Sequence, residues 1–488
     1  MLILKNTILK LMFRLTFYLS ILFTFQSFAQ KEVIIRGKIS GPEDNKIHIR
    51  NIKHYKDYLN ISKIYYASTD LSDNGTFEMK FEVERSMPVQ IDYGDASMEM
   101  FVFPGAILDV TANGKNFAGS LSYKGTGEEF NNFLVKYYDK FESPKEVEKL
   151  RQNIQTMTTG DFMNFNNKRK SSQTDMLNSV FKGNISSTFK TYMEINIQYD
   201  WAKNFLEYFN YALQKNIPID TSRYSFLKEI QIENTKAFSS TKYLEFLKSY
   251  SGNLYYKDCA EKIRIGEEID TNKYYYEQYK IRLVYFSDDK IKELLLAKAI
   301  ADAIDNPNLP KVSHDVDKML RNYSTVTNNQ NFFKVLLKKY RTLNALAPGN
   351  PAPDFTYKDK NGQEVSLSSF KGKVVYVDVW ASWCGICRKE IPHTKKLEEK
   401  FRNENVAIVY VSIDRVEKMW RKIIDENGLG GTNLLTEEHF DSKIVQDYNI
   451  QSVPHYILID QNGTVVENRT KNASEGIERD IQALLGKK

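Results

Sequence analysis

The amino-acid sequence predicts a multidomain α+β protein with an N-terminal β-sandwich, a central helical region and a C-terminal α/β domain. The chain has 488 residues, which is more than one ordinary domain contains. After residue 30 it has short β-branched runs separated by turn signals, and its middle has longer runs with helical periodicity. Near its C-terminal end, strands of the buried type alternate with helices, a pattern typical of an α/β domain.

The first 29 residues have the features of a secretory signal peptide. They contain three basic residues, then an apolar stretch, then a small-residue cleavage pattern: Lys5, Lys10 and Arg14; Leu15–Phe25; and Ser27–Ala29. We predict cleavage after Ala29 and export to the periplasm, with an uncleaved membrane anchor as the alternative. Removal of this segment lowers the formal net charge from +6 to +3, which is too small a charge to indicate a nucleic-acid partner.

Residues 30–127 are predicted to form a β-sandwich-like accessory domain. Short strand-like runs follow one another at Val33–Ile35, Lys46–Ile52, Lys63–Ala67, Thr76–Val83, Val89–Tyr93, Met98–Phe103 and Ile107–Val110. Asn74-Gly75 predicts a hairpin between two of these strands, and Asn113-Gly114 predicts another turn. Several short strands at this spacing are typical of a β-sandwich.

Residues 128–345 are predicted to form a helical domain. Ser143-Pro144-Lys145-Glu146 predicts a helix start, with a capping box and a proline in the first turn. Other helices are expected at Phe130–Lys140, Val147–Thr156, Phe189–Gln214, Ser240–Tyr250, Lys273–Tyr285, Asp288–Asp302, Val312–Tyr323 and Phe332–Ala345. Helix breaks are expected at Gly160, Pro218, Gly252, Pro307 and Pro310.

Two features of the helical domain have alternative interpretations. An aromatic stripe within Tyr199–Tyr211 is typical of helix-core packing, and a groove for a partner is the other possibility. Cys259 is either a buried inert thiol or a regulatory or intermolecular one.

Residues 346–353, with the sequence LAPGNPAP, are predicted to be a stiff linker because three prolines and a glycine lie within eight residues. The α/β domain, residues 354–488, begins with a hairpin at Asn361-Gly362 and ends with another at Asn462-Gly463. Between them, Val374–Val379 and Val406–Ile413 are expected to be buried parallel strands, each followed by a helix.

Two cysteines lie at the junction between the first of these strands and its helix. Cys384 falls at a helix N-terminus, where unsatisfied N–H groups and the positive end of the helix dipole favour a thiolate. Two residues separate it from Cys387, the right spacing for a short disulfide ring across the first turn. We predict that Cys384 is exposed and attacks a partner disulfide, and that the more buried Cys387 resolves the mixed disulfide.

Several motifs occur in a familiar order: Pro351–Phe355, Ser366–Lys373, Val377–Gly385, Cys387–Pro392, Val411–Asp414 and Val453-Pro454. Through them, residues from about 349 to 488 resemble the thioredoxin fold, in its exported TlpA/ResA-like branch of thiol-disulfide oxidoreductases. Ile386 stands where many relatives have a proline between the cysteines. The N-terminal region resembles the small β accessory domain that often precedes such domains, through Gly37, Asp73–Phe77 and Gly125–Gly127.

The resemblance implies roles for residues around the cysteines. Val453-Pro454 resembles the thioredoxin cis-proline loop, so Pro454 would turn the Val453 backbone toward an extended substrate. Asp378 has the spacing of the buried acid in thioredoxin and would relay a proton to or from Cys387; a partly solvated carboxylate without a role is the alternative. Substrate contacts are expected from Trp383, Gly385, Ile386 and Val453. Glu390 and His393 are expected to be exposed helix residues.

The resemblance implies a periplasmic reductase of protein disulfides that works through a CxxC dithiol/disulfide cycle. Its partners would be protein thiol or disulfide clients, with apocytochrome c during cytochrome c maturation as one candidate, and a membrane thiol electron donor. No cofactor or metal is predicted. A partner-binding or redox-sensing module, in which the thioredoxin domain is a scaffold, is the main alternative. Half of a zinc site is another, and a peroxiredoxin is a third, although Val377 and Trp380-Ala381 stand where that chemistry requires Pro and Thr or Ser.

Overall fold

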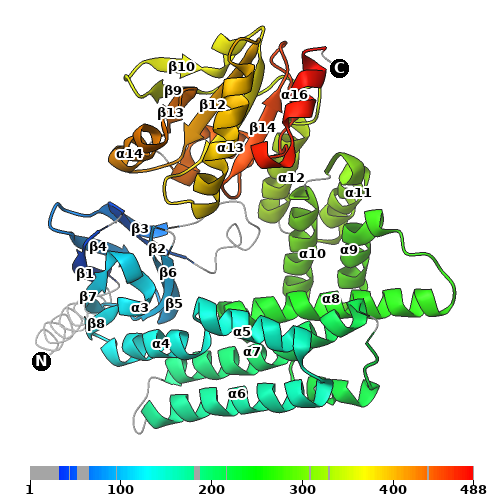
Figure 1. Ribbon diagram of the computed structural model, residues 1–488. Coiled ribbons are helices and arrows are strands. Elements are labelled where there is room, and N and C mark those ends of the chain that lie inside the picture. The colour runs from blue at the N-terminus through cyan, green and yellow to red at the C-terminus, as the bar shows by residue number, and fades with distance from the viewer. Residues whose placement is uncertain are drawn as a thin grey trace, which may run out of the picture. The chain divides into compact units, whose positions relative to one another are not determined.

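The computed structural model describes residues 32–42, 44–51, 65–94, 96–180, 187–215, 217–306, 309–327, 330–436 and 439–486 (Figure 1). They form two compact units. One contains the described residues up to 201 together with 237–243, and the other contains 202–236 and those from 244 onward. The predicted signal peptide, residues 1–29, lies outside the described ranges. Within these ranges, no helix is both long enough and apolar enough to cross a membrane.

The first unit contains two four-stranded β-sheets, with strand orders β4-β1-β7-β8 and β3-β2-β5-β6. Buried and exposed residues alternate strictly along β4 and β7, so one face of their sheet packs into the core. The predicted N-terminal β architecture is therefore confirmed. The strands are β1 (Glu32–Ser40), β2 (Lys46–Arg50), β3 (Tyr65–Asp70), β4 (Thr76–Glu82), β5 (Met87–Tyr93), β6 (Ala96–Val102), β7 (Ile107–Asn113) and β8 (Ser122–Gly125).

The predicted hairpin at Asn74-Gly75 is wrong. β4 pairs with β1 and β3 pairs with β2, so this turn connects one sheet to the other. Gly75 has a φ of +80°, and a Cβ at this position would lie 2.1 Å from the carbonyl oxygen of Ile39 in β1. Period-two alternation identifies the buried face of a strand but not its partner. The close approach of β1 to the turn decides the pairing here.

Helices follow the strands of the first unit: α3 (Phe117–Ser120), α4 (Glu128–Phe141), α5 (Pro144–Thr156), α6 (Thr159–Val180) and α7 (Ser187–Gln214), of which α7 continues into the second unit. The fully buried Asn131 joins α4 to β6, because it accepts a hydrogen bond from the Phe101 N–H (2.8 Å) and donates one to the Phe101 carbonyl (3.0 Å). The sequence prediction omits α6 because it treats Gly160 as a helix breaker. Gly160 lies in the first turn of α6 with open space around it, where the helix tolerates glycine.

The predicted capping box at the start of α5 is also wrong. Pro144 occupies the first turn as predicted, but the Ser143 side chain makes no capping hydrogen bond. Its hydroxyl instead donates to the Asp139 carbonyl in the last turn of α4 (3.0 Å). The capping hydrogen bond is absent because α4 ends immediately before Ser143. The Ser143 hydroxyl instead bonds to a carbonyl group in the last turn of α4.

The helical part of the second unit is built around α10. This helix is buried on nearly all sides, as expected of a helix at the centre of a core. Asp288 caps it by accepting hydrogen bonds from the N–H groups of Lys290 and Ile291, both at 3.0 Å. The helices are α8 (Thr241–Arg264), α9 (Tyr274–Tyr285), α10 (Asp289–Ile304), α11 (Leu309–Val326) and α12 (Gln330–Ala345).

The aromatic stripe of α7 is mostly core. Tyr199, Trp201, Phe205, Tyr208 and Phe209 are buried, which supports the core-packing interpretation for them. Tyr211, at the end of the stripe, is only half-buried.

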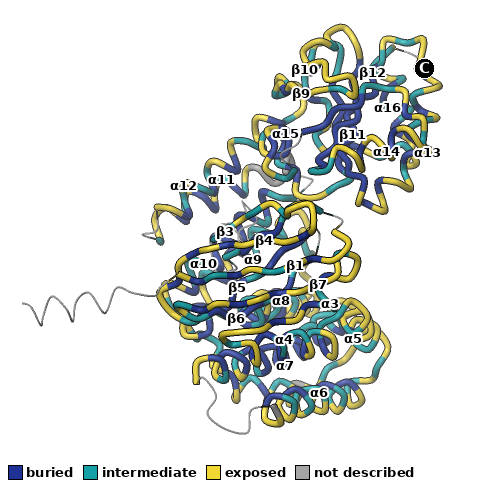
Figure 2. Tube along the Cα trace, turned by 90° about the vertical axis from the view of Figure 1, so that its left-hand side faces the viewer, coloured by how far each residue is buried: buried dark blue, intermediate teal, exposed yellow. Residues whose placement is uncertain are grey.

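The C-terminal α/β part contains a seven-stranded sheet of order β10-β9-β13-β12-β11-β14-β15. Its central strand, β11, is buried at every residue and appears dark blue in Figure 2. β11 runs parallel to β12 and antiparallel to β14. The strands are β9 (Thr356–Asp359), β10 (Glu364–Ser366), β11 (Val374–Trp380), β12 (Val406–Ser412), β13 (Thr432–Leu435), β14 (His455–Ile459) and β15 (Val465–Glu467), and the helices are α13 (Gly385–Phe401), α14 (Glu417–Asn427), α15 (Lys443–Asp447) and α16 (Glu478–Leu484).

Both hairpins predicted in this part are present, because β9 pairs with β10 and β14 pairs with β15. The sequence prediction omits β13, which has only four residues, one of them the buried Asn433. The Asn433 amide nitrogen donates to the Gly431 carbonyl (2.9 Å). A polar residue in so short a strand hides the apolar pattern on which a prediction depends.

The segment predicted as a linker lies against the C-terminal sheet. The Gly349 N–H donates to the Val465 carbonyl (2.8 Å), and the Ala352 N–H donates to the Gly463 carbonyl (2.9 Å). The assignment of residues 346–353 as a domain boundary, like the boundaries near residues 30 and 128, stays a prediction.

Candidate active site

The two cysteines lie where β11 gives way to α13. Cys384 is the N-cap residue of α13, and its Sγ accepts a hydrogen bond from the Cys387 N–H (3.1 Å). The two sulfurs form a disulfide. Cys384 is 7% exposed and Cys387 is 3% exposed. The expectation that Cys384 is exposed is therefore wrong for this oxidised state, although it is the less buried of the pair.

The loop before β14 lies against the first of these sulfurs. The Val453–Pro454 peptide bond is cis. The Val453 carbonyl oxygen lies 3.7 Å from Cys384 Sγ, and Val453 itself is half-buried. The structure thus places Val453 and Pro454 beside Cys384.

An exposed apolar surface adjoins Cys384. Trp383 is 38% exposed and Ile386 is 66% exposed, and Gly385 is also exposed. The Trp383 ring lies edge-on to His439, with ring centroids 5.6 Å apart, and 6.4 Å from Phe440. Neither His439 nor Phe440 could be predicted from the sequence, since no motif connects them with the cysteines.

Asp378, in the middle of β11, is 4% exposed. Burial, and secondarily the negative charge of Glu390, raise the pKa of Asp378 to about 8, and a hydrogen bond with Thr394 opposes this rise. The carboxyl group is therefore mostly protonated at pH 7. The alternative of a solvated carboxylate does not fit this burial.

Glu390 is half-buried on α13 rather than exposed as expected. Its carboxylate accepts hydrogen bonds from the Ser474 N–H (3.3 Å) and hydroxyl (2.8 Å). These contacts fix the position of the Glu390 carboxylate, whose negative charge helps to raise the pKa of Asp378. His393, one turn further on, is exposed as expected.

His455 follows Pro454 and is 3% exposed. Burial, and secondarily the charge of Arg469, lower the pKa of His455 to about 4. Its Nε2 lies 2.6 Å from the Asn468 carbonyl oxygen. The imidazole is therefore neutral at pH 7 and adds no positive charge beside the cysteines.

A buried carboxylate fixes the loop that leads to Cys384. Asp414 is 2% exposed. It accepts hydrogen bonds from the Ser382 N–H (2.8 Å), the Ser382 hydroxyl (2.7 Å) and the Ser412 hydroxyl (2.6 Å). The turn between β11 and α13 is therefore attached to the end of β12, and Asp414 is a positioning residue.

Asp414→Asn is expected to lower the free energy of unfolding by about 3 kcal/mol, because an amide NH₂ would face donors that now meet a carboxylate oxygen. Urea unfolding followed by fluorescence measures the change. Asp425→Asn, on the exposed side of α14, is the matched control and should change stability little. A loss no larger than in this control would contradict the role of Asp414.

Comparison with known proteins decides the family. The Redoxin family matches residues 347–485. The thiol-disulfide oxidoreductase ResA of Geobacillus kaustophilus is 30% identical over 141 residues, which cover 29% of this chain and 79% of the relative. The chain belongs to the ResA-like thiol-disulfide oxidoreductases.

Other ResA-like and thioredoxin-like proteins match the same part of the chain. The thioredoxin-like protein YneN of Bacillus subtilis is 33% identical over 119 residues, or 24% of this chain and 68% of the relative. A crystal structure of a putative thiol-disulfide oxidoreductase from Bacteroides vulgatus is 32% identical and covers 29% of this chain and 98% of that one, with a TM-score of 0.27.

Membership of the ResA-like family shows that this chain is a thiol-disulfide oxidoreductase. The matched residues include Cys384, Cys387, Asp378, Val453 and Pro454. Cys259 lies half-buried on α8, outside the matched residues. Among the residues that the structure describes, no group of three or more His, Cys, Asp or Glu side chains could hold a metal ion.

Proposed function

We propose that this ResA-like enzyme reduces disulfides in exported proteins through a dithiol/disulfide cycle of Cys384 and Cys387. The observation that carries the proposal is a bonded CxxC pair whose first sulfur lies at the N-terminus of α13, 3.1 Å from a backbone N–H. A helix N-terminus stabilises a sulfur anion as it forms, at the sulfur that must attack.

The cycle begins when the Cys384 thiolate attacks one sulfur of a client disulfide and the other client sulfur leaves as a thiolate. Cys387, as a thiolate, then attacks the Cys384 sulfur and releases the second client thiol. Two electrons pass from the enzyme dithiol to the client disulfide, and the Cys384–Cys387 disulfide forms. A thiol donor, proposed to be a membrane protein, then reduces this disulfide.

Side chains around the cysteines have complementary roles in this cycle. The Val453 carbonyl, 3.7 Å from Cys384 Sγ, would accept an N–H from an extended client and so align the client disulfide with the attacking sulfur. Trp383, Gly385 and Ile386 would contact the residues that flank the client cysteine. Asp378, buried and with a raised pKa, would accept the Cys387 proton.

The contacts of Cys384 act on the thiolate in opposite directions. A strong oxidant of this fold owes its potential to extra stabilisation of its reduced form. At Cys384 the hydrogen bond from the Cys387 N–H favours the thiolate, but the nearby Val453 carbonyl dipole opposes it. These contacts therefore do not fix the direction, and the proposed reductive direction follows from the resemblance to the ResA-like family.

Equilibration with glutathione tests this direction. We expect a reduction potential close to the roughly −270 mV of a thioredoxin-type reductant, rather than the roughly −120 mV of a strong oxidant. The fraction of reduced enzyme at defined glutathione ratios, read by thiol alkylation and mass spectrometry, gives the value. A potential above that of the glutathione couple would contradict the reductase proposal and indicate an oxidase.

The proposed location is the periplasm, after removal of residues 1–29. The basic, apolar and small-residue pattern of that segment supports export. An apocytochrome c is one candidate client, because its cysteines must be reduced before haem attachment.

A further inference from the structure

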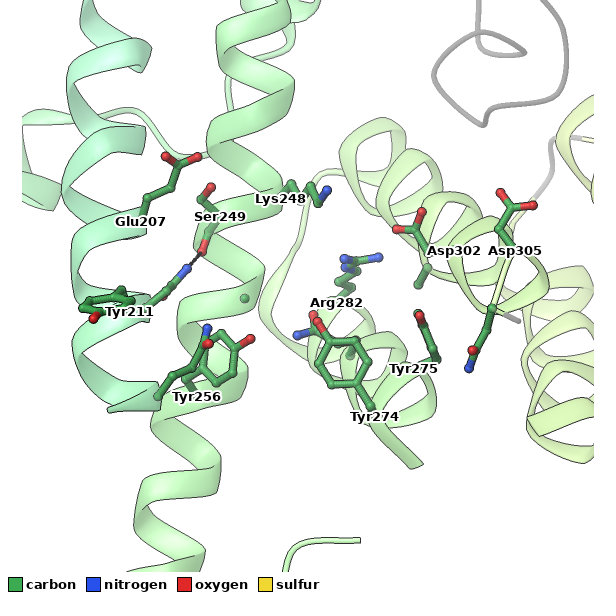
Figure 3. A pocket seen from close by; sticks show the side chains of 16 residues that line it. Glu207, Tyr211, Lys248, Ser249, Tyr256, Tyr274, Tyr275, Arg282, Asp302 and Asp305 are labelled. Carbon is green, nitrogen blue, oxygen red and sulfur yellow. Dashed lines mark hydrogen bonds between the residues drawn. The ribbon is translucent and has the colours of Figure 1, made fainter. Parts of the chain in front are cut away.

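A cavity of about 600 Å³ lies in the helical part of the second unit. Figure 3 shows that side chains from α7 and α8 form one wall and side chains from α9 and α10 form the other. Its volume lies within the range of small-molecule and cofactor sites. The residues of the cavity have no part in the proposed thiol chemistry.

Gln278 on α9 is the feature that points to a ligand. It lines the cavity and is 3% exposed. By distance and angle, neither its amide oxygen nor its amide nitrogen makes a full hydrogen bond to the residues that the structure describes, and the group that interacts with it is the hydroxyl of Tyr274, which also lines the cavity. Burying such a group unsatisfied costs roughly 1–3 kcal/mol. A ligand that presents a donor and an acceptor side by side would remove this cost.

Asn210, in the opposite wall, provides the contrast. Its Nδ2 donates to the Ser249 carbonyl (3.0 Å), the bond drawn as a dashed line in Figure 3. Its Oδ1 accepts from the Asn253 amide (2.9 Å). Asn210 therefore has a structural role between α7 and α8, whereas no such pair of hydrogen bonds holds the carboxamide of Gln278.

Tyrosine side chains form much of the cavity lining. Tyr211 comes from α7, Tyr256 from α8, and Tyr274 and Tyr275 from α9 (Figure 3). Burial, and secondarily the neighbouring Tyr274, raise the pKa of Tyr256 to about 12, so its phenol keeps its proton. Phenol rings offer apolar faces for aliphatic or prolyl side chains, and their hydroxyls can donate to carbonyl groups.

Charges of both signs face the cavity. Lys248 and Arg282 bring positive charge, and Glu207, Asp302 and Asp305 bring negative charge. Asp302 pairs with Lys298 (2.7 Å) and Asp305 pairs with Lys339 (2.6 Å), so these two carboxylates are largely neutralised. This balance favours a polar ligand without a large net charge.

We propose that this cavity binds an extended polypeptide segment of a client protein through its peptide groups. Each peptide group carries one donor and one acceptor, which is what Gln278 lacks, and the tyrosine rings suit the side chains between those groups. The proposal rests on the proposed function only in taking proteins as the clients. The site would hold unfolded chains independently of their cysteines.

A thiol-free probe tests the proposal on the full mature chain in its oxidised form. The probe is fluorescein-labelled α-lactalbumin that has been reduced and carbamidomethylated, so that it is unfolded and cannot react with Cys384. We expect saturable binding by fluorescence anisotropy, weakened about 10-fold by Gln278→Leu, which corresponds to the loss of two hydrogen bonds. Tyr211→Ala, in the other wall, should also weaken binding.

Gln155→Leu is the matched control, because Gln155 is exposed on α5, outside the cavity. It should bind like the wild type. Gln278→Leu replaces an unsatisfied buried amide by an apolar group of similar size, so its thermal stability should not fall. Binding by Gln278→Leu equal to that of the wild type would overturn the proposal, as would binding of a neutral oligosaccharide such as maltohexaose but not of the polypeptide.

The result for the cavity proposal can be distinguished from the result for the proposed thiol cycle. If the wild-type protein binds the probe but shows no Cys384-dependent insulin reduction, the proposed function is contradicted and the cavity proposal is supported. Insulin reduction without probe binding would do the reverse.

Discussion

Replacing Cys384 with serine is expected to abolish disulfide reduction by this enzyme, lowering the rate to that of the uncatalysed control. The thiolate at the start of α13 is the attacking group, and a serine hydroxyl is not ionised near pH 7. Serine is smaller than cysteine and fits the same position, so loss of activity should not come from misfolding. Insulin reduction with dithiothreitol as electron source, followed by turbidity, measures the effect.

Replacing Cys387 should give a different failure. In Cys387→Ser the first attack occurs but resolution does not, so a mixed disulfide with the client accumulates and dithiothreitol releases it. Non-reducing electrophoresis and mass spectrometry detect this species. Mixed disulfides formed by Cys384→Ser through Cys387 would reverse the assigned roles.

Cys259→Ser is the matched control for both variants. Cys259 lies half-buried on α8, outside the Redoxin match, so this variant should reduce insulin at the wild-type rate. Retained activity in Cys384→Ser would mean that another group attacks the client disulfide, and the proposed cycle would be wrong.

Much of the C-terminal part could be predicted because its strands, turns and helices are specified by patterns within short segments of the sequence. An apolar run followed by a cysteine and an amphipathic pattern specifies a buried strand, a junction and a helix within one short segment. That segment alone places Cys384 at a helix N-terminus and Asp378 inside a sheet. Turn residues such as Asn361-Gly362 likewise specify a hairpin between adjacent strands.

Features that depend on distant segments could not be predicted. The hydrogen bonds from Ser382 to Asp414 and the packing of Trp383 on His439 join residues more than 30 positions apart. The unsatisfied carboxamide of Gln278 depends on the packing of several helices, and on paper Gln278 is an ordinary polar helix residue. The pairing of β4 with β1 rather than with β3 likewise depends on contacts between strands that are distant in the sequence.

Replacing Asp378 with asparagine is expected to stabilise the protein, and to do so increasingly at higher pH. Its pKa is about 8 in the folded protein, against an ordinary value of 3.8. Between these values the folded state holds a proton that the unfolded state has released. Wild-type stability should therefore fall as pH rises from about 4 to about 8 and then level off. Asparagine removes this dependence.

The gain in the free energy of unfolding should be several kcal/mol at pH 9, with an upper bound of roughly 6 kcal/mol set by the two pKa values. Urea unfolding of wild type and Asp378→Asn at pH 5, 7 and 9, both oxidised, measures it. Tryptophan fluorescence reports on this region because Trp380, Trp383 and Trp420 are three of the four tryptophans in the chain.

Asp460→Asn is a control with the opposite sign. Partial burial raises the pKa of Asp460, but backbone and side-chain hydrogen bonds at Thr464 and Asn462 together outweigh it and hold this pKa below its usual value. This substitution should destabilise the protein at neutral pH, with less effect once acid protonates the wild-type carboxylate. A difference between Asp378→Asn and the wild type that does not grow from pH 5 to pH 9 would contradict a raised pKa.

The same substitution should slow resolution of the mixed disulfide, because asparagine cannot take the proton that Cys387 must lose before it attacks. In the wild type, a carboxyl group with a pKa near 8 is available as a base to an increasing extent as pH rises through that value. The wild-type resolution rate should therefore rise across pH 6–9 with a component near pH 8 that Asp378→Asn lacks. Stopped-flow measurement of client release gives both profiles, and coincident profiles would exclude Asp378 from the proton transfer while leaving its effect on stability intact.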